Sequence, residues 1–175
     1  MSTKFKIIWI TGLSGSGKST LAQFVAMRLQ NQLVRVIMLD GDLLRKVFFI
    51  DSKDKLRFHK NSRIKLAKQY GMLCQILSEQ GFTVVISTIS MFQEIYSWNR
   101  KHLDGYFEVF LDIPLTELRR RDPKGIYRSY DQGLIKNVAG LDLKIDEPTN
   151  PNLKFDLQQG YTASMMADEI LKIII

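Results

Sequence analysis

Short apolar runs alternate with longer amphipathic stretches along the chain, a pattern that predicts strands alternating with helices. The apolar runs predict buried strands at Phe5–Ile10, Leu33–Leu39, Phe82–Ser87, Tyr106–Asp112 and, more briefly, Leu153–Leu157. Apolar residues at helical spacing predict helices at Gly17–Gln32, Ser62–Gln80, Met91–Leu103, Thr116–Arg121 and Thr162–Ile174. Residues 122–152 are polar and show no clear period, so we predict no regular element there.

Strands that alternate with helices form right-handed βαβ units around a parallel sheet. We therefore expect an α/β fold in three layers, with helices on both faces of the sheet. The 175 residues suit a single domain, which we expect over residues 1–175. Catalytic residues of such folds lie just beyond the carboxyl ends of the strands. One edge of the sheet should then collect Gly12–Ser19, Asp40–Asp42, Ser87–Ser90 and the chain from Asp112 onward.

The composition excludes several classes of protein. Cys74 is the one cysteine in the sequence, which excludes an intrachain disulfide framework and a Cys-rich metal site. No apolar run approaches the ~18–20 residues of a membrane span, and the N-terminus lacks the pattern of a secretory signal peptide. We therefore expect a soluble, cytoplasmic protein that does not bind membranes.

The positive charge is concentrated in one segment. The chain has 25 Lys and Arg against 18 Asp and Glu, a formal net charge of +7. Residues 43–69 carry nine basic and two acidic residues, so this segment accounts for the whole excess. The segment can be a solvated helix face, a nucleic-acid patch or a pocket for a small polyanion.

A glycine-rich loop follows the first predicted strand. Residues 12–19 read G-L-S-G-S-G-K-S and match the phosphate-binding pattern G-x-x-x-x-G-K-[ST]. In this pattern backbone N–H groups cradle phosphates, the Lys reaches the β- and γ-phosphates, and the Ser hydroxyl is a ligand of Mg²⁺. We therefore expect ATP and Mg²⁺ as cofactors. The expected ATP-binding residues of the loop are Gly12, Ser14, Gly15, Ser16, Gly17, Lys18, Ser19 and Thr20.

A kinase also needs an acid near the γ-phosphate, to hold Mg²⁺ or to take the proton of the acceptor. Asp40 and Asp42 follow the second predicted strand and are the candidates. The alternative interpretation of both is turn and cap chemistry at a strand end. The third strand ends without an acid, and the chain has no Asn-Lys-x-Asp motif of a GTPase. Arg119–Arg121 can form a basic lid over phosphates or simply end a surface helix.

Several blocks, in order, resemble the adenylylsulfate (APS) kinase family over about residues 5–153. Ile10–Thr20 is similar to its phosphate-binding block, and Asp40-Gly-Asp42 with Arg45 to its D-G-D-x-x-R block. The most specific match is R-D-P-K-G-I-Y at Arg121–Tyr127, beside the family's R-D-P-K-G-L-Y. The resemblance implies a P-loop kinase fold with a basic lid over about residues 115–152.

The resemblance also implies an ATP-dependent kinase that phosphorylates the 3′-hydroxyl of a small nucleotide, as a homodimer. Lys18, Asp40 and Asp42 would be catalytic, with Asp42 as general base and Ser19 and Asp40 on Mg²⁺. Arg121 and Lys124 would close on ATP. Ser90 matches the family's serine to which a phosphoserine intermediate is ascribed, although direct in-line transfer needs none. The implied substrate-binding residues are Asp42, Arg45, Arg57, Lys60, Asn61, Arg63, Ile89, Ser90 and Val138.

The chain departs from the family on the side of the nucleotide substrate. The block R-x-x-N-I-R-R keeps only Asn61 and Arg63, with Arg57 one residue away from the lost first arginine. The block I-S-P-[FY]-R loses its proline and its arginine at residues 89–93. The phenylalanine of F-T-G, which stacks on the substrate adenine, is Val138. Stacking is worth ~1–3 kcal/mol per base, so these changes favour a smaller base.

Two acceptors remain open. The substitutions favour cytidine diphosphoramidate, the substrate of a relative that serves capsule phosphoramidate biosynthesis. The alternative is adenylyl sulfate, whose phosphorylation gives 3′-phosphoadenylyl sulfate for sulfate assimilation. A more distant alternative is a polynucleotide-binding P-loop protein that uses the aromatic and basic residues of segment 43–69. The lack of net positive charge elsewhere argues against a nucleic-acid partner.

Overall fold

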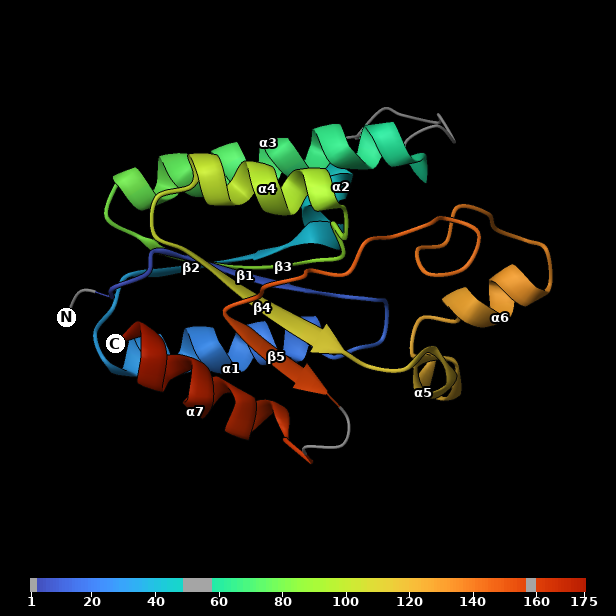
Figure 1. Cartoon of the computed structure of the whole chain (residues 1–175). Helices are drawn as coiled ribbons and strands as arrows, with labels where there is room; N and C mark the ends of the chain where they lie inside the picture. Colours follow the sequence, from blue (N-terminus) through green and yellow to red (C-terminus); the bar gives the residue numbers. More distant parts are fainter. Residues whose placement is uncertain (1–2, 49–57, 157–159) are drawn as a thin grey trace.

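The computed structural model describes residues 3–48, 58–156 and 160–175, which form a parallel sheet between two layers of helices (Figure 1). The five strands lie in the order β2-β3-β1-β4-β5, and all neighbours pair in parallel. Their bounds are β1 Ile7–Gly12, β2 Val36–Asp40, β3 Thr83–Thr88, β4 Tyr106–Asp112 and β5 Leu153–Asp156. The α/β fold with helices on both faces, predicted from the sequence, is confirmed.

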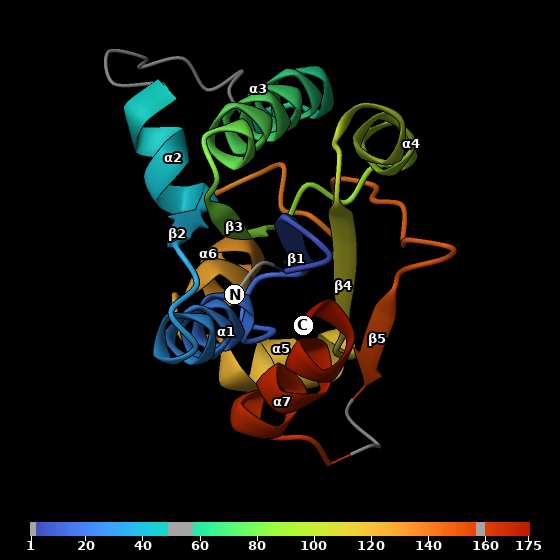
Figure 2. The ribbon, with the colours of Figure 1, turned by 90° about the vertical axis from the view of Figure 1, so that its left-hand side faces the viewer.

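Each face of the sheet is covered by two long helices (Figure 2). One face carries α1 (Lys18–Asn31) and α7 (Ala163–Ile174), and the other carries α3 (Lys60–Glu79) and α4 (Gln93–His102). Three short helices gather near the carboxyl ends of the strands: α2 (Gly41–Phe48), α5 (Leu115–Arg121) and α6 (Ile126–Asp131). The predicted lid, residues 115–152, therefore begins with α5 and α6 and returns to the sheet as an extended segment.

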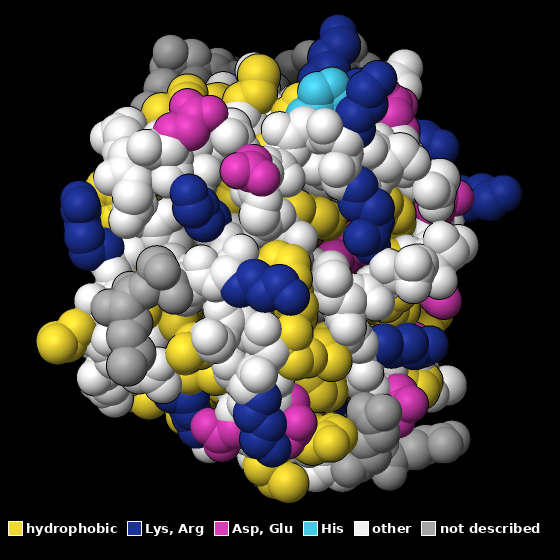
Figure 3. Space-filling model, turned by 60° about the vertical axis from the view of Figure 1, so that its left-hand side comes forward, with side chains coloured by type: hydrophobic (Ala, Val, Ile, Leu, Met, Phe, Trp, Pro, Cys, Tyr) yellow, Lys and Arg dark blue, Asp and Glu magenta, His cyan; other side chains and the backbone are white. Residues whose placement is uncertain are grey.

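The surface turned forward in Figure 3 lies toward the amino ends of the strands. Lys and Arg side chains are scattered there among acidic and apolar ones rather than gathered in a patch. Among the described residues, no helix combines the length and the apolarity needed to cross a membrane.

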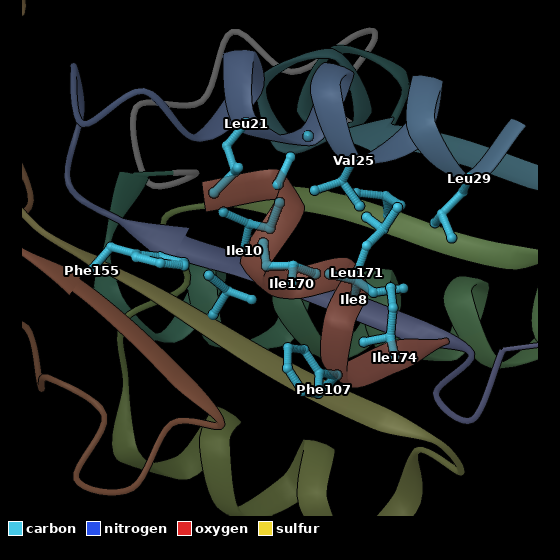
Figure 4. Packing of buried hydrophobic residues seen from close by; sticks show 14 of the residues in the cluster. Ile8, Ile10, Leu21, Val25, Leu29, Phe107, Phe155, Ile170, Leu171 and Ile174 are labelled. Carbon is cyan, nitrogen blue, oxygen red and sulfur yellow. The ribbon is translucent and has the colours of Figure 1, made fainter. Parts of the chain in front are cut away.

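The core has two halves because successive side chains of a strand point to opposite faces of the sheet. In β1, Ile8 and Ile10 face α1 and α7, where they pack with Leu21, Val25 and Ile170 (Figure 4). On the other face Ile7 and Trp9 pack against Tyr70 and Cys74 of α3. Both halves are continuous apolar clusters, so the sheet is a rigid base for residues at its carboxyl edge.

A buried carboxylate joins β4 to α4. The Glu108 side chain in β4 is fully buried and accepts hydrogen bonds from Arg100 and from the Tyr106 hydroxyl. Arg100 also donates to the carbonyl of Asn150 (2.5 Å), and the Glu108 amide donates to Asn152 (2.8 Å). Burial raises the pKa of Glu108, against the lowering effect of Arg100. These bonds fix the chain that enters β5, far from the predicted catalytic residues.

The sequence prediction missed two short helices. We predicted no helix directly after Asp40, but α2 begins at Gly41 with no connecting loop. We expected no regular element in residues 122–152, but α6 lies within it. The Asp122 carboxylate caps α6 by accepting from the amides of Tyr127 (3.2 Å) and Arg128 (3.0 Å). Each helix is shorter than the stretch of sequence that is needed to recognise a helical period of apolar residues.

Candidate active site

The glycine-rich loop joins β1 to α1 at the carboxyl edge of the sheet. Gly12 has a φ of 152° and lies so close to β4 that a Cβ there would be 2.8 Å from the carbonyl oxygen of Leu111. A side chain is therefore excluded on steric grounds. Lys18, the first residue of α1, turns back over the loop and donates to the Leu13 carbonyl (2.6 Å) and to the Ser16 hydroxyl (3.3 Å). The loop has the folded-back form of a phosphate cradle.

The surroundings of Lys18 destabilise the charged form of its ammonium group. Burial lowers its pKa to about 8, against Asp42 and Asp40, which raise it, while Lys124 lowers it further. A cation that is partly desolvated and faces another cation is stabilised by an anion between them. This corner of the molecule is therefore suited to a phosphate.

Asp40 is the best-anchored carboxylate of the site. It ends β2 and accepts from the hydroxyls of Ser19 (2.7 Å) and Ser87 (3.1 Å) and from the amides of Asp42 (2.9 Å) and Leu43 (3.3 Å). Burial alone would raise its pKa, but these hydrogen bonds outweigh it and lower the pKa below the usual value. Asp40 is thus an ionised carboxylate beside the loop hydroxyl.

The pair of Ser19 and Asp40 fits a magnesium ion. Mg²⁺ prefers oxygen ligands and is usually held by one or two carboxylates together with phosphate oxygens and waters. An ionised carboxylate and a hydroxyl 2.7 Å apart are such a donor set. No cluster of three or more His, Cys, Asp or Glu residues suited to a metal occurs among the described residues, so phosphates and water would complete the coordination.

Asp42 lies two residues further on, in the first turn of α2. Gly41 makes this abrupt change from strand to helix possible, because a Cβ there would be 2.9 Å from the Thr88 hydroxyl oxygen. The Asp42 carboxylate is exposed and accepts from the Lys124 ammonium at 2.5 Å. The strand end thus holds one aspartate against the loop, while the helix directs the other into the open site.

The first part of the lid rests on the loop. The Tyr127 hydroxyl donates to the Ser14 carbonyl (2.9 Å), and a Cβ at Gly15 would lie 3.4 Å from the ring of Pro123. Lys124 and Pro123 line a cavity of about 280 Å³. Its other lining residues come from the loop, the β2–α2 junction and the end of β3: Ser14, Gly15, Gly17, Lys18, Ser19, Thr20, Asp40, Gly41, Asp42, Arg45, Ser87, Thr88 and Ile89. Most of the predicted ATP-side residues therefore converge on one cavity.

Arg121 is tied to its own helix. Its guanidinium donates to the Glu117 carboxylate at 2.7 Å, and Arg120 donates to the same carboxylate. Arg121 does not line the cavity of about 280 Å³, so its contact with ATP stays a prediction.

Two residues of the predicted substrate side lie on one aromatic ring. The Arg45 and Arg63 guanidinium carbons lie 5.5 and 5.7 Å from the centroid of the Phe58 ring. Arg63 also donates to the carbonyls of Phe58 (2.8 Å) and Asn137 (2.9 Å). Arg45 lines the cavity beside Asp42. Sequence reasoning identified both arginines but missed Phe58, whose ring places them together.

The end of β3 contributes hydroxyl groups rather than acids. Ser90 has a φ of 22°, a conformation that residues other than glycine rarely adopt. Its hydroxyl lies 2.8 Å from that of Thr88, and Thr11 donates to the Ile89 carbonyl at 2.7 Å. Ser87 was also missed as a partner of Asp40, although adjacent β2 and β3 pair these residues directly.

The remaining predicted substrate residues are dispersed. Lys60 and Asn61 are exposed at the start of α3, with the Lys60 ammonium 5.7 Å from the Phe92 ring centroid. Val138 is buried and packs in a cluster with Ile113, Leu118 and Tyr127. Its contact with an acceptor base stays a prediction. Arg57 lies outside the described residues.

A larger cavity of about 490 Å³ lies beside this site, not in it. It is bounded by Met91, Phe110, Leu141 and Ile145, and Leu13 of the glycine-rich loop forms part of its wall. Asp112, Asp142, Lys144 and Glu147 also line it. The glycine-rich loop with Lys18, together with Asp40 and Asp42, lines the smaller cavity, so size does not identify the chemical centre here.

The chain is similar in sequence and in structure to known kinases. The sequence model described as adenylylsulphate kinase matches residues 4–156. The chain is 39% identical over 142 residues to the cytidine diphosphoramidate kinase of Campylobacter jejuni, covering 81% of each chain. It is 37% identical over 152 residues to the adenylyl-sulfate kinase of Pseudomonas aeruginosa, covering 86% of this chain and 76% of that one. The APS kinase of Mycobacterium tuberculosis in complex with AMPPNP and APS superimposes with a TM-score of 0.87 at 32% identity, covering 97% and 96% of the two chains.

Proposed function

The chain belongs to the adenylylsulphate kinase family, and from this premise we propose that it transfers the γ-phosphate of ATP to the 3′-hydroxyl of an activated nucleotide. The observation that carries the proposal is a single cavity lined by Lys18, Asp42 and Arg45. These residues supply a phosphate cation, a carboxylate that can take a proton, and a second cation for an anionic acceptor.

The division of labour follows from the contacts. Lys18 and the loop amides bind the β- and γ-phosphates of ATP. Asp42 accepts the proton of the attacking 3′-hydroxyl once Lys124 has left it for a phosphate. Arg121 and Lys124 stabilise the charge of the transferred group and, with Pro123 over the loop, exclude water. Transfer is direct and in line, with no covalent step through Ser90.

Ser19 and Asp40 hold Mg²⁺ in this proposal. The ion would supply positive charge that neutralises the phosphates of ATP. The chain's contribution is to keep Asp40 ionised through four hydrogen bonds. The same bonds keep Asp40 oriented toward the loop, which separates the metal ligand from the base.

For the acceptor we propose cytidine diphosphoramidate, with adenylyl sulfate as the second candidate. Support comes from the substitutions at residues 89–93 and at Val138, which remove a proline, an arginine and an aromatic ring from the family's substrate blocks. The relative from Campylobacter jejuni carries that activity by name. The sequence identities of 39% and 37% to relatives of the two kinds are too similar to distinguish the two acceptors. Our preference for cytidine diphosphoramidate therefore rests on the substitutions.

The decisive experiment measures ATP consumption with each nucleotide side by side. We expect turnover with both ATP and cytidine diphosphoramidate present, and a higher kcat/KM than with adenylyl sulfate. A preference of about 100-fold for adenylyl sulfate, equal to about 2.7 kcal/mol, would reverse the assignment. Turnover with neither nucleotide would reject both acceptors. Binding of single-stranded oligonucleotides at physiological salt tests the distant alternative.

The proposal includes a homodimer in the cytoplasm, where ATP is available. Light scattering on the purified chain measures the mass directly. The dimer should have twice the 20.2 kDa of the chain, and a mass near the monomer would remove this part of the proposal.

A further inference from the structure

Two guanidinium groups share one aromatic ring at the mouth of the candidate site. Arg45 comes from α2 and Arg63 from the first turns of α3, and both lie within cation–π distance of Phe58. Phe58 immediately precedes α3 in the described chain. Contact with one ring brings two like charges together, which is unfavourable unless an anion compensates for it.

The two arginines differ in what their N–H groups do. Arg63 donates through Nε to the Phe58 carbonyl (2.8 Å) and through Nη2 to the Asn137 carbonyl (2.9 Å). Arg45 has a buried Nη1 with no hydrogen-bond partner among the described residues. A buried, unpaired donor of a charged group is expensive to leave unsatisfied. The Arg45 guanidinium therefore has a buried donor available for a ligand, whereas two donor groups of Arg63 are already engaged with carbonyls.

The surroundings reinforce this difference. Burial lowers the pKa of Arg63 to about 10, and Arg45 lowers it further, against Asp42 and Asp142. Within the described residues neither arginine forms an ion pair with a carboxylate. Arg45 also lines the cavity that holds Asp42 and Lys18, so its unpaired donor lies next to the groups that act on the acceptor.

We infer that Phe58 is a positioning residue that holds the Arg45 guanidinium ready for the anionic head of the acceptor nucleotide, while Arg63 fastens the returning lid segment at Asn137. This inference rests on the proposed function and assigns the arginines different tasks. Arg45 binds the anhydride head of the acceptor. Arg63 holds the Asn137 carbonyl and thereby the segment that follows it.

The ring itself can be tested by two substitutions that differ in aromatic character. Phe58→Leu keeps an apolar side chain but removes the negative face of the ring, and Phe58→Tyr keeps both. We expect the Leu variant to raise the KM for the acceptor about 5- to 30-fold and to leave the KM for ATP within about 2-fold, as loss of a partly desolvated cation–π contact implies. The Tyr variant should restore the acceptor KM.

A matched control exists at the opposite edge of the sheet. Arg35 lies 4.3 Å from the Phe82 ring centroid, the same kind of contact just before β3. Phe82→Leu makes the same chemical change away from the site and should leave both KM values unchanged. Equal acceptor KM values for the Leu and Tyr variants of Phe58, or an equal rise in both KM values, would overturn the inference.

A binding measurement separates this inference from the proposed function. Protein saturated with ADP and Mg²⁺ has its glycine-rich loop filled, so calorimetric titration with inorganic pyrophosphate reports a second anion site. We expect binding to wild type, loss of at least 5-fold in affinity in Phe58→Leu and in Arg45→Met, and little change in Arg63→Met. Equal pyrophosphate binding by wild type and Phe58→Leu would reject the positioning role. Failure of wild type to phosphorylate either nucleotide would instead reject the proposed function and leave the pyrophosphate result standing.

Discussion

The donor side and the acceptor side of the candidate site are built in opposite ways. On the donor side, Lys18 and Asp40 have their hydrogen-bonding groups engaged with loop carbonyls, hydroxyls and amides. On the acceptor side, the Arg45 guanidinium keeps a buried donor unpaired. The donor side is also where the sequence keeps its motif unchanged, whereas the acceptor side is where it departs from the family.

The contrast indicates where specificity can change in this fold. A loop whose polar groups bind one another tolerates few substitutions, because each change leaves a partner unsatisfied. An arginine with a vacant donor, placed on an aromatic ring, can accommodate anionic groups of different shape. We therefore expect a change of acceptor to come from substitutions on the acceptor side, while the loop that binds ATP stays unchanged.

The largest expected effect on catalysis comes from replacing Asp42, whose carboxylate lies between the donor side and the acceptor side. Asp42→Asn should lower kcat about 1000-fold, within the range of general-base removal, with both KM values changed less than about 3-fold. Steady-state kinetics with the better acceptor measures this. Asp168→Asn removes an exposed carboxylate that pairs with Arg28 on the α1–α7 face and serves as the control. A loss of less than 10-fold in Asp42→Asn would place the base elsewhere.

Arg45→Met should weaken binding of the acceptor nucleotide and leave binding of ATP unchanged. Loss of a hydrogen bond to a charged group is worth about 1.5–3 kcal/mol, so the acceptor KM should rise about 10- to 100-fold. The KM for ATP should stay within about 2-fold. Lys46→Met, on the exposed next residue of α2, controls for the change of charge. If Arg45→Met weakens ATP and acceptor equally, the two sides are not independent.

Lys18→Met should show that the buried lysine on the donor side lowers the stability of the nucleotide-free protein, although it is needed for binding. Burial holds the pKa of Lys18 near 8, below the 10.5 of an exposed lysine. Between these values the unfolded chain binds more protons, so the free energy of unfolding rises with pH through this window. Replacing the lysine should stabilise the nucleotide-free protein at pH 7 by about 1–2 kcal/mol while abolishing most activity.

Urea unfolding of both proteins at pH 7 and pH 10 measures this effect. The wild type should gain stability relative to Lys18→Met as the pH rises, because its lysine loses the charge that burial opposes. A destabilised Lys18→Met at pH 7 would contradict the argument, since the hydrogen bonds to Leu13 and Ser16 would then outweigh desolvation.

The smallest effect concerns the contact between lid and loop. Tyr127→Phe removes the hydroxyl that donates to the Ser14 carbonyl. A neutral hydrogen bond is worth about 0.5–1.5 kcal/mol, so the KM for ATP should rise about 2- to 10-fold with no change for the acceptor. Tyr130→Phe, on the same helix, is the matched control. An acceptor-specific effect of Tyr127→Phe would show that α6 serves the other side.

The sequence predicted the sheet, and it placed the glycine-rich loop and Asp40 at strand ends, because these features rest on local chemistry. Apolar runs define strands, and a fixed spacing defines the loop. The β2–α2 junction was missed because it depends on a close approach of Gly41 to Thr88, which only the order of the strands creates. Phe58 was missed because its partners lie on α2 and α3, and no periodic pattern links residues 45, 58 and 63.

Two cations of the lid each pair with a carboxylate. Glu117 holds Arg121, and Asp42 holds Lys124. If a nucleotide phosphate takes these cations, loading exchanges one counter-ion for another and unloading reverses the exchange. When the product leaves, each lid cation returns to its carboxylate and is not left unpaired. The free-energy barrier to product release is therefore lowered. Under the proposed function, such an arrangement would favour rapid turnover over tight retention of ADP.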